Sequence, residues 1–294
     1  MAKGALKIKK DVLCIAFTMV LSLLLASCSG AVGPQASSVA IPPAFGVAQS
    51  AEEKHEPVTI LVAAAASVEY CYKNELIPMF EKKYPWVTVE GSYDSSGKLQ
   101  TQIEQGLEAD VFMPAAQKQM GALEEQGLIE AGSIVKLLKN EIVLIVPAGG
   151  ESIVKSFEDV VNSSSLAVGD PETVPAGQYA KEALTSLGLW EAVKASASYG
   201  TNVTEVLHWV AEGSADAGIV YATDAATNPK VKVVATAPPN SLASAIIYPV
   251  GILANSAHKT EAELFVEFLQ SPAALEVFKK YGFTPNIKAT ASTP

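Results

Sequence analysis

Arginine is absent from this 294-residue sequence, in which 21 basic residues, all of them lysines, stand against 31 acidic ones. The formal net charge is −10. Proteins that bind nucleic acids neutralise backbone phosphates with clustered cationic side chains, so this composition argues against nucleic acid as a partner. Histidine is also scarce. His55, His208 and His258 lack the spacing of zinc ligands, which argues against a zinc site.

The sequence also lacks an apolar run long enough to span a membrane as a helix. The longest candidate, from Val12 to Leu25, has 14 residues, whereas a spanning helix needs about 20. Lysines precede it, and Leu25-Ala26-Ser27-Cys28 ends it in a way that resembles the lipobox of bacterial lipoproteins. We therefore predict a lipoprotein signal peptide over residues 1–27 and a lipidated Cys28 that anchors the protein on the extracytoplasmic face of the cell membrane. A plain secretory signal cleaved nearby is the alternative.

Cysteine is the third scarce residue type. Cys14 lies in the predicted signal peptide and Cys28 would carry the lipid, which leaves Cys71 alone. A single cysteine cannot form an intrachain disulfide, and we expect Cys71 to be a small buried apolar side chain. Residues 28–56 are rich in Ala, Ser, Gly and Pro, which predicts a disordered tether between the membrane and the folded part.

From Val58 onward, short apolar runs alternate with segments of helical periodicity. Strand-like segments rich in apolar residues occur at 58–62, 141–147 and 217–221, and helical patterns at 178–187 and 203–212. This alternation predicts an α/β fold with mostly parallel sheets flanked by helices.

The alternating pattern occurs in two blocks, which predicts two lobes. We expect residues 57–139 and 237–294 in lobe 1 and residues 140–236 in lobe 2. A ligand would then bind in the cleft between the lobes, at the carboxyl ends of the strands.

Small polar residues and glycines stand just before several predicted helices. Ser67 follows the first strand, Ser95-Ser96-Gly97 precedes a helix, and Pro175-Ala176-Gly177 and Asn202-Val203 open two more. Helix N-termini offer free N–H groups and partial positive charge, so they bind anions without any cationic side chain. Ordinary helix caps favour the same residue types. From the residues alone, an anion site and a set of plain N-caps therefore both remain open.

Longer motifs carry a resemblance to a known family. They are Ala64-Ala65-Ala66-Ser67, Tyr93-Asp94-Ser95-Ser96-Gly97-Lys98-Leu99, Ala109-Asp110-Val111-Phe112, the stretch from Val168 to Leu184, Gly218-Ile219-Val220-Tyr221, and Phe278-Lys279-Lys280-Tyr281-Gly282-Phe283. In order and spacing they resemble the periplasmic molybdate-binding proteins of ABC importers, over residues from about 57 to 284. The stretch from Val168 to Leu184 is the longest and most specific of these motifs.

This resemblance implies a type II periplasmic-binding-protein fold that closes around one oxyanion and performs no chemistry on it. In that family two serines, two backbone amides and a tyrosine hydroxyl hold the anion. The matching positions here are Ser67, Ser96, Ala176, Val203 and Tyr221. The implied ligand is molybdate or tungstate, bound as an intact oxyanion and not as a bare metal cation. The resemblance further implies no cofactor, no enzymatic activity, and a monomer that delivers its ligand to the permease of an ABC importer.

Two alternatives stay open beside this interpretation. One is a binding protein for sulfate or another tetrahedral oxyanion; protonated phosphate fits less well, because its proton would meet another donor. The other is a lipid-anchored serine hydrolase, since Ser95-Ser96-Gly97-Lys98 satisfies the Ser-x-x-Lys motif of β-lactamase-like enzymes. The companion motifs Ser-Asp-Asn and Lys-Thr-Gly are missing from the sequence, which argues against the hydrolase.

Overall fold

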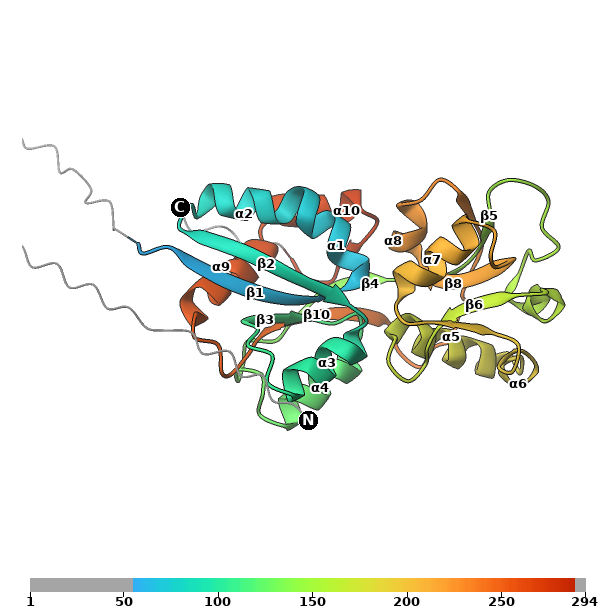
Figure 1. The fold of residues 1–294 in the computed structure, drawn as a ribbon, viewed down its shortest axis with the longest axis horizontal. Helices are drawn as coiled ribbons and strands as arrows, with labels where there is room; N and C mark the ends of the chain where they lie inside the picture. Colours follow the sequence, from blue (N-terminus) through green and yellow to red (C-terminus); the bar gives the residue numbers. More distant parts are fainter. Residues whose placement is uncertain (1–54, 289–294) are drawn as a thin grey trace, which may run out of the picture. The chain divides into compact units, whose positions relative to one another are not determined.

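The computed structural model describes residues 55–288, and Figure 1 shows their fold. The predicted signal peptide, Cys28 and all of the predicted tether except His55 and Glu56 lie outside the described residues. Within the described range, none of the helices is long and apolar enough to cross a membrane.

Two β-sheets form the two lobes of the fold (Figure 1). The first sheet has six strands in the order β11-β4-β10-β3-β1-β2. Their bounds are β1 Val58–Ala65, β2 Val87–Asp94, β3 Val111–Met113, β4 Val135–Asn140, β10 Ile246–Ile252 and β11 Thr284–Pro285. The second sheet has five strands in the order β7-β6-β8-β5-β9. Their bounds are β5 Ile142–Pro147, β6 Leu166–Gly169, β7 Ser198–Gly200, β8 Ala217–Tyr221 and β9 Val231–Thr236.

The direction of the strands adds a detail that the sequence did not predict. The two-lobed α/β fold is as expected, and most strands of each sheet run in one direction, although each sheet also contains antiparallel pairs. Strands β1, β2 and β3 pair in parallel, as do β6, β7 and β8, whereas β10 and β5 run antiparallel to both of their neighbours. The reason is connectivity. The chain enters β5 and β10 directly after crossing from the other sheet, so these two strands begin at the edge where β3 and β8 end.

Helices cover both faces of each sheet (Figure 1). Their bounds are α1 Glu69–Cys71, α2 Ile77–Lys83, α3 Ser96–Glu104, α4 Gln117–Glu125, α5 Pro175–Ser186, α6 Trp190–Val193, α7 Val203–Ala211, α8 Ala222–Ala226, α9 Lys259–Leu269 and α10 Pro272–Lys280. In the view of Figure 1, α2 and α10 lie above the first sheet and α3 and α4 below it, while α7 lies above the second sheet and α5 below it.

Strand β1 illustrates why the apolar runs are nearly continuous. Ile60 and Val62 belong to the same buried cluster as Phe80 of α2, whereas Ala63 belongs to the cluster that contains Leu99 of α3. A strand covered on both faces needs apolar residues at every position and not at alternate ones. Cys71 is buried and unbridged, as expected for a small apolar side chain.

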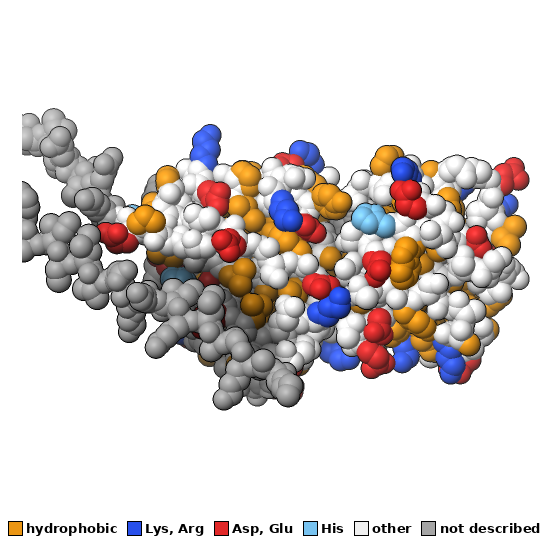
Figure 2. All heavy atoms as spheres, in the orientation of Figure 1, with side chains coloured by type: hydrophobic (Ala, Val, Ile, Leu, Met, Phe, Trp, Pro, Cys, Tyr) orange, Lys and Arg blue, Asp and Glu red, His pale blue; other side chains and the backbone are white. Residues whose placement is uncertain are grey.

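Acidic and basic side chains are intermingled on the face of the molecule shown in Figure 2. Basic side chains gather nowhere on that face into a patch that could follow a nucleic-acid backbone.

Candidate functional site

The five residues expected to hold an anion line one small cavity between the lobes. Its walls are formed by Ala65, Ala66, Ser67, Asp94, Ser95, Ser96 and Ala115 on one side and by Val174, Pro175, Ala176, Val203 and Tyr221 on the other. The space open to the centre of a water-sized sphere is about 10 Å³, roughly enough for one water molecule. Neither lysine nor histidine is among these wall residues, so the groups that face the cavity are neutral apart from one carboxylate, that of Asp94.

Ser67 reaches the cavity from the carboxyl end of β1. The strand ends at Ala65, and one 3-10 turn, Ala66–Val68, carries Ser67. The alanines before it are buried, and their short side chains let the neighbouring elements approach this strand end closely. Ser67 itself is buried, and its Oγ lies 2.9 Å from the hydroxyl of Tyr248.

Ser96 is the first residue of α3, and Ser95 precedes it as the N-cap. The Oγ of Ser96 accepts a hydrogen bond of 2.9 Å from the backbone N–H of Ala115. Ser95 makes no capping hydrogen bond, and its buried hydroxyl has no partner among the described residues. Ordinary helix capping therefore accounts for neither serine, and both hydroxyls lie in the wall of the cavity.

Asn202 behaves differently, because its side chain caps its own helix. Its Oδ1 accepts from the backbone N–H of Glu205 at 3.0 Å. The backbone N–H groups of Ala176 and Val203 lie in the first turns of α5 and α7, where no intrahelical carbonyl is available to them. These two amides are therefore free to donate into the cavity that their residues line.

The start of α5 is held against β6 by two glycines. A Cβ at Gly177 would lie 1.9 Å from the carbonyl oxygen of Gly169, and one at Gly169 would lie 2.5 Å from the side chain of Val174. Only glycine permits such an approach. This contact fixes where the amide of Ala176 points, and it explains the glycines of the stretch from Val168 to Leu184.

Tyr221 ends β8 and closes the cavity from the second lobe. Its hydroxyl lies 3.4 Å from the carbonyl oxygen of Ala115, a long contact between the lobes. Burial raises the pKa of Tyr221 well above its usual value, so the phenol keeps its proton and remains a donor.

A second contact between the lobes lies beside the cavity. The backbone N–H of Gly97 donates to the carbonyl oxygen of Thr173 at 2.9 Å. A Cβ at Gly97 would come within 2.5 Å of that oxygen. The lobes thus meet through backbone at this edge, in the arrangement expected of a closed binding protein.

Two carboxylates near the cavity are occupied by other groups. Asp94 Oδ1 accepts from the backbone N–H of Ser95 at 2.7 Å and pairs with Lys98 at 3.2 Å. Asp224 lies buried at the start of α8, where its Oδ2 accepts from the backbone N–H of Tyr221 at 3.3 Å. Burial raises the pKa of Asp224 to about 7, so this group is at least partly protonated near neutral pH.

Comparison with known proteins places this geometry in a family. The profile of the bacterial extracellular solute-binding proteins matches residues 60–284. This chain belongs to that family. A relative from Bacillus subtilis, named as an ABC transporter substrate-binding lipoprotein (YvgL), is 44% identical over 236 residues, which cover 80% of this chain and 90% of the relative. The molybdate-binding protein ModA of Escherichia coli is 36% identical over 248 residues, which cover 82% of this chain and 93% of ModA.

A solved structure agrees with these sequence relatives. The periplasmic molybdate-binding protein of Azotobacter vinelandii superposes with a TM-score of 0.66 and 25% identity, covering 76% of this chain and 98% of that protein. The two-lobed fold that the sequence predicts is therefore the fold of a solute-binding protein, which captures its ligand and does not transform it.

Membership of this family gives no support to the serine hydrolase. Lys98 of the Ser-x-x-Lys pattern pairs with Asp94, and among the described residues neither Ser95 nor Ser96 has a lysine or histidine as hydrogen-bond partner. Without a base, a serine hydroxyl is a weak nucleophile. The pattern is a coincidence of the helix start in this solute-binding protein.

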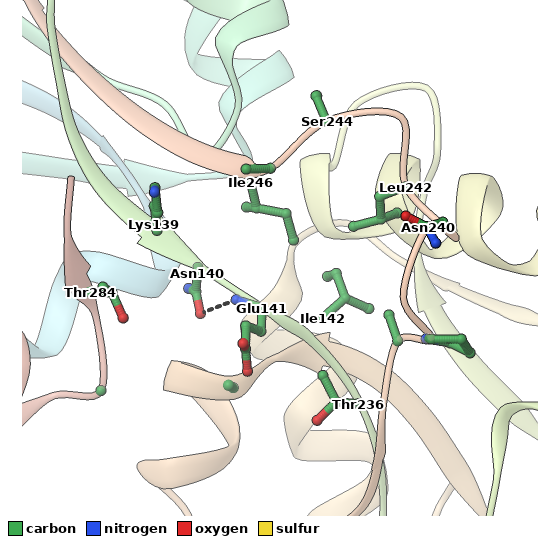
Figure 3. A pocket seen from close by; sticks show the side chains of 15 residues that line it. Lys139, Asn140, Glu141, Ile142, Thr236, Asn240, Leu242, Ser244, Ile246 and Thr284 are labelled. Carbon is green, nitrogen blue, oxygen red and sulfur yellow. Dashed lines mark hydrogen bonds between the residues drawn. The ribbon is translucent and has the colours of Figure 1, made fainter.

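A larger cavity lies where the chain crosses between the sheets (Figure 3). It measures about 560 Å³ on the same scale, and it is lined by both crossings, including Lys139, Asn140 and Glu141 in one and Asn240 and Leu242 in the other. The polar side chains drawn in Figure 3 do not point toward one common position in this cavity. The one hydrogen bond drawn joins two adjacent residues, from Glu141 N to Asn140 Oδ1. We attribute this space to the hinge of the solute-binding protein, not to its ligand site.

Two groups that bind the serine hydroxyls were not predicted from the sequence. One is the N–H of Ala115, which binds Ser96 Oγ; the other is Tyr248 on β10, which binds Ser67 Oγ. Ala115 lies in an irregular segment after β3, and Tyr248 is 181 residues from Ser67. A local sequence pattern cannot reveal such contacts, although a buried tyrosine in a strand commonly needs a hydrogen-bond partner.

Proposed function

We propose that this solute-binding protein captures molybdate or tungstate outside the cytoplasm and delivers it to the permease of an ABC importer. The observation that carries the proposal is the wall of the small cavity, in which Ser67, Ser96, Ala176, Val203 and Tyr221 come together without a cationic side chain. Relatives that share 36% and 25% of their aligned residues with this chain are named for molybdate. The oxyanion is a transported ligand here, and the proposal involves no cofactor.

The chemistry of the donors supports a small, fully deprotonated oxyanion. Hydroxyls and amides of the free helix starts can all donate, and a doubly charged tetrahedral anion offers only acceptors. Sulfate has the same charge and shape as molybdate but is smaller, so the size of the closed cavity would have to separate the two.

The lobes that close on the ligand are proposed to be residues 57–139 with 237–294, and residues 140–236. Support comes from the two places where the strands change sheet, between Asn140 and Ile142 and between Thr236 and Ile246. Membrane attachment through Cys28 and a monomeric state are further parts of the proposal. The lipoprotein name of the relative from Bacillus subtilis supports the former.

Calorimetric titration of the purified protein with molybdate, tungstate, sulfate and phosphate tests the proposal. Molybdate and tungstate should bind with 1:1 stoichiometry and raise the melting temperature, because a ligand at 100 times its Kd adds about 2.7 kcal/mol to the folded state. Phosphate should bind much more weakly and should raise the melting temperature far less at the same concentration. Tighter binding of sulfate than of molybdate would favour the alternative of a sulfate-binding protein, and equal binding of phosphate would contradict the argument from neutral donors.

A further inference from the structure

A chain of buried hydrogen bonds runs from the crossing between the lobes to the hydroxyl of Ser67. The Oδ1 atom of Asn140 accepts from the backbone N–H of Glu141 at 2.9 Å, as Figure 3 shows. This contact fixes the orientation of the Asn140 amide, because only the oxygen end can accept. The Nδ2 end donates to the hydroxyl of Tyr248 at 3.1 Å and to Oγ1 of Thr223 at 2.9 Å.

The direction of the next hydrogen bond follows from the first. Distance alone allows either Tyr248 or Ser67 to donate across the 2.9 Å between their hydroxyls. Asn140 Nδ2 carries hydrogens only, so the Tyr248 oxygen must accept from it. The hydrogen of a fully buried hydroxyl needs an acceptor. The hydroxyl of Tyr221 also interacts with Tyr248, but the acceptor at hydrogen-bond distance is Ser67 Oγ at 2.9 Å, so we assign the hydrogen of Tyr248 to Ser67. Burial raises the pKa of Tyr248 well above its usual value, so the phenol retains that hydrogen.

Ser67 is therefore an acceptor toward Tyr248, and its own hydrogen is left for the cavity. Ser96 shows the same arrangement through a different partner. Its oxygen accepts from the N–H of Ala115 at 2.9 Å, and a backbone N–H can never accept. In this arrangement both serine oxygens accept a hydrogen bond from behind, and each serine presents its own hydrogen to the cavity.

We propose that Tyr248, oriented by Asn140, is a positioning residue that sets Ser67 as a hydrogen-bond donor to the ligand and thereby determines selectivity between deprotonated and protonated oxyanions. The inference rests on the proposed function. An anion without protons finds a hydrogen at Ser67, whereas the proton of a hydrogen phosphate ion faces that same hydrogen. Without Tyr248, the Ser67 hydroxyl can rotate and accept from the ligand.

The variant Tyr248→Phe tests this role with little change in packing. The phenylalanine keeps the ring that packs against Tyr221 and Phe283 at centroid distances of 5.5 and 5.4 Å. Affinity for molybdate should fall roughly 3- to 10-fold, the loss of one neutral hydrogen bond. Affinity for phosphate should stay the same or rise, so that the ratio of the two affinities falls.

Tyr72→Phe is the matched control. Tyr72 is also fully buried, and its hydroxyl donates to Sδ of Met113 at 2.8 Å, away from the wall of the cavity. This variant should lose a similar amount of stability and leave the affinity ratio unchanged. Asn140→Ala is a second test, because Tyr248 can then accept from Ser67, and it should also lower the ratio.

Calorimetric titration at constant pH gives the affinities, and thermal unfolding of the ligand-free proteins reports on folding. A proportional loss of affinity for both anions in Tyr248→Phe and Asn140→Ala would mean a merely structural role and overturn the inference. Unchanged affinities in both variants would overturn it as well. If the wild-type protein bound no molybdate, the proposed function would fail and the inference with it. A lowered ratio in either folded variant, with Tyr72→Phe unchanged, supports the role of Tyr248.

Discussion

The two lobes contribute different kinds of proposed donor to the same cavity. The first lobe contributes the hydroxyls of Ser67 and Ser96, each held by a partner at 2.9 Å. Besides Tyr221, the second lobe contributes two backbone amides, those of Ala176 and Val203 at the starts of α5 and α7. A hydroxyl donor disappears when its residue is replaced, whereas an amide donor depends only on where the helix begins. Single side-chain substitutions should therefore remove the donors of the first lobe, whereas in the second lobe, Tyr221 apart, only shifts of the backbone should remove them.

Gly177→Ala should have the largest effect, because it moves the backbone of the second lobe. The added Cβ would lie 1.9 Å from the carbonyl oxygen of Gly169, so α5 must shift away from β6 and carry the amide of Ala176 with it. We expect a loss of about 3 kcal/mol in the free energy of unfolding and a loss of molybdate binding of at least about 100-fold. Urea unfolding and calorimetric titration measure the two.

Gly121→Ala in the middle of α4 is the control for this substitution. No atom lies within 4 Å of the added Cβ there, so the variant should gain up to about 1 kcal/mol of stability from helix propensity and bind normally. If Gly177→Ala kept its affinity, the position of the α5 start would not matter to the ligand, and the backbone half of the comparison would be wrong.

Ser96→Ala tests the hydroxyl half. A hydrogen bond to a charged group contributes roughly 1.5–3 kcal/mol, which predicts affinity for molybdate weaker by about 10- to 150-fold. Ser96 makes no capping bond, but its Oγ accepts from the buried N–H of Ala115, so the ligand-free variant should also lose about 1–3 kcal/mol in the free energy of unfolding. Titration and thermal unfolding separate these effects.

Ser95→Ala is the control for Ser96→Ala. It is a strict control, because the Ser95 hydroxyl lies in the same cavity wall. This buried hydroxyl has no partner among the described residues. The resemblance assigns only Ser96 to the ligand. If Ser95→Ala abolished binding and Ser96→Ala left it intact, the assignment would be wrong by one residue.

The fold and the candidate site differ in how far they could be predicted from the sequence. The α/β fold and its two lobes follow from the apolar runs, since strands buried on both faces leave a strong signal. The sequence did not predict β4, whose lysines at 136 and 139 interrupt the apolar pattern, or the three-residue strand β7. The reversed direction of β5 and β10 was not predicted either, because it depends on how the chain crosses between sheets and not on periodicity.

The site was predictable only in part. The five proposed ligand residues came from motifs, each of them local, and the structure brings all five to one cavity. The motifs could not indicate which residues bind and orient the proposed ligand residues. Tyr248 reaches Ser67 through the order β10-β3-β1 of the first sheet, which no short segment of sequence encodes.

Asp224→Asn should change the pH dependence of stability by a moderate amount. The pKa of this aspartate rises from 3.8 to about 7 on folding because it is buried, so between these pH values the folded protein binds more protons than the unfolded one. The stabilising contribution of the protonated Asp224 is therefore fully present at low pH and is lost as pH rises toward 7. Above that pH this group causes no further change in the free energy of unfolding. The variant, which keeps an acceptor for Tyr221 N–H, should gain on the order of 1–3 kcal/mol relative to wild type between pH 4 and pH 7. Urea unfolding across this range measures the difference, and a constant difference would contradict it.

Val203→Ala should have the smallest effect on binding and is the most direct test of the comparison. Val203 begins α7 and lines the cavity, but its proposed contact is the backbone N–H, which alanine retains. Asn202 still caps the helix through Glu205 N–H, so the start of α7 should not move. Loss of the buried side chain should cost about 1–2 kcal/mol in the free energy of unfolding, while affinity for molybdate stays within about 3-fold of wild type. Ser67→Ala, a substitution of similar size in the first lobe, removes a proposed donor and should weaken affinity by tenfold or more. If Val203→Ala reduced affinity as much as Ser67→Ala does, the valine side chain itself would shape the anion site, and the division between side-chain and backbone donors would not hold.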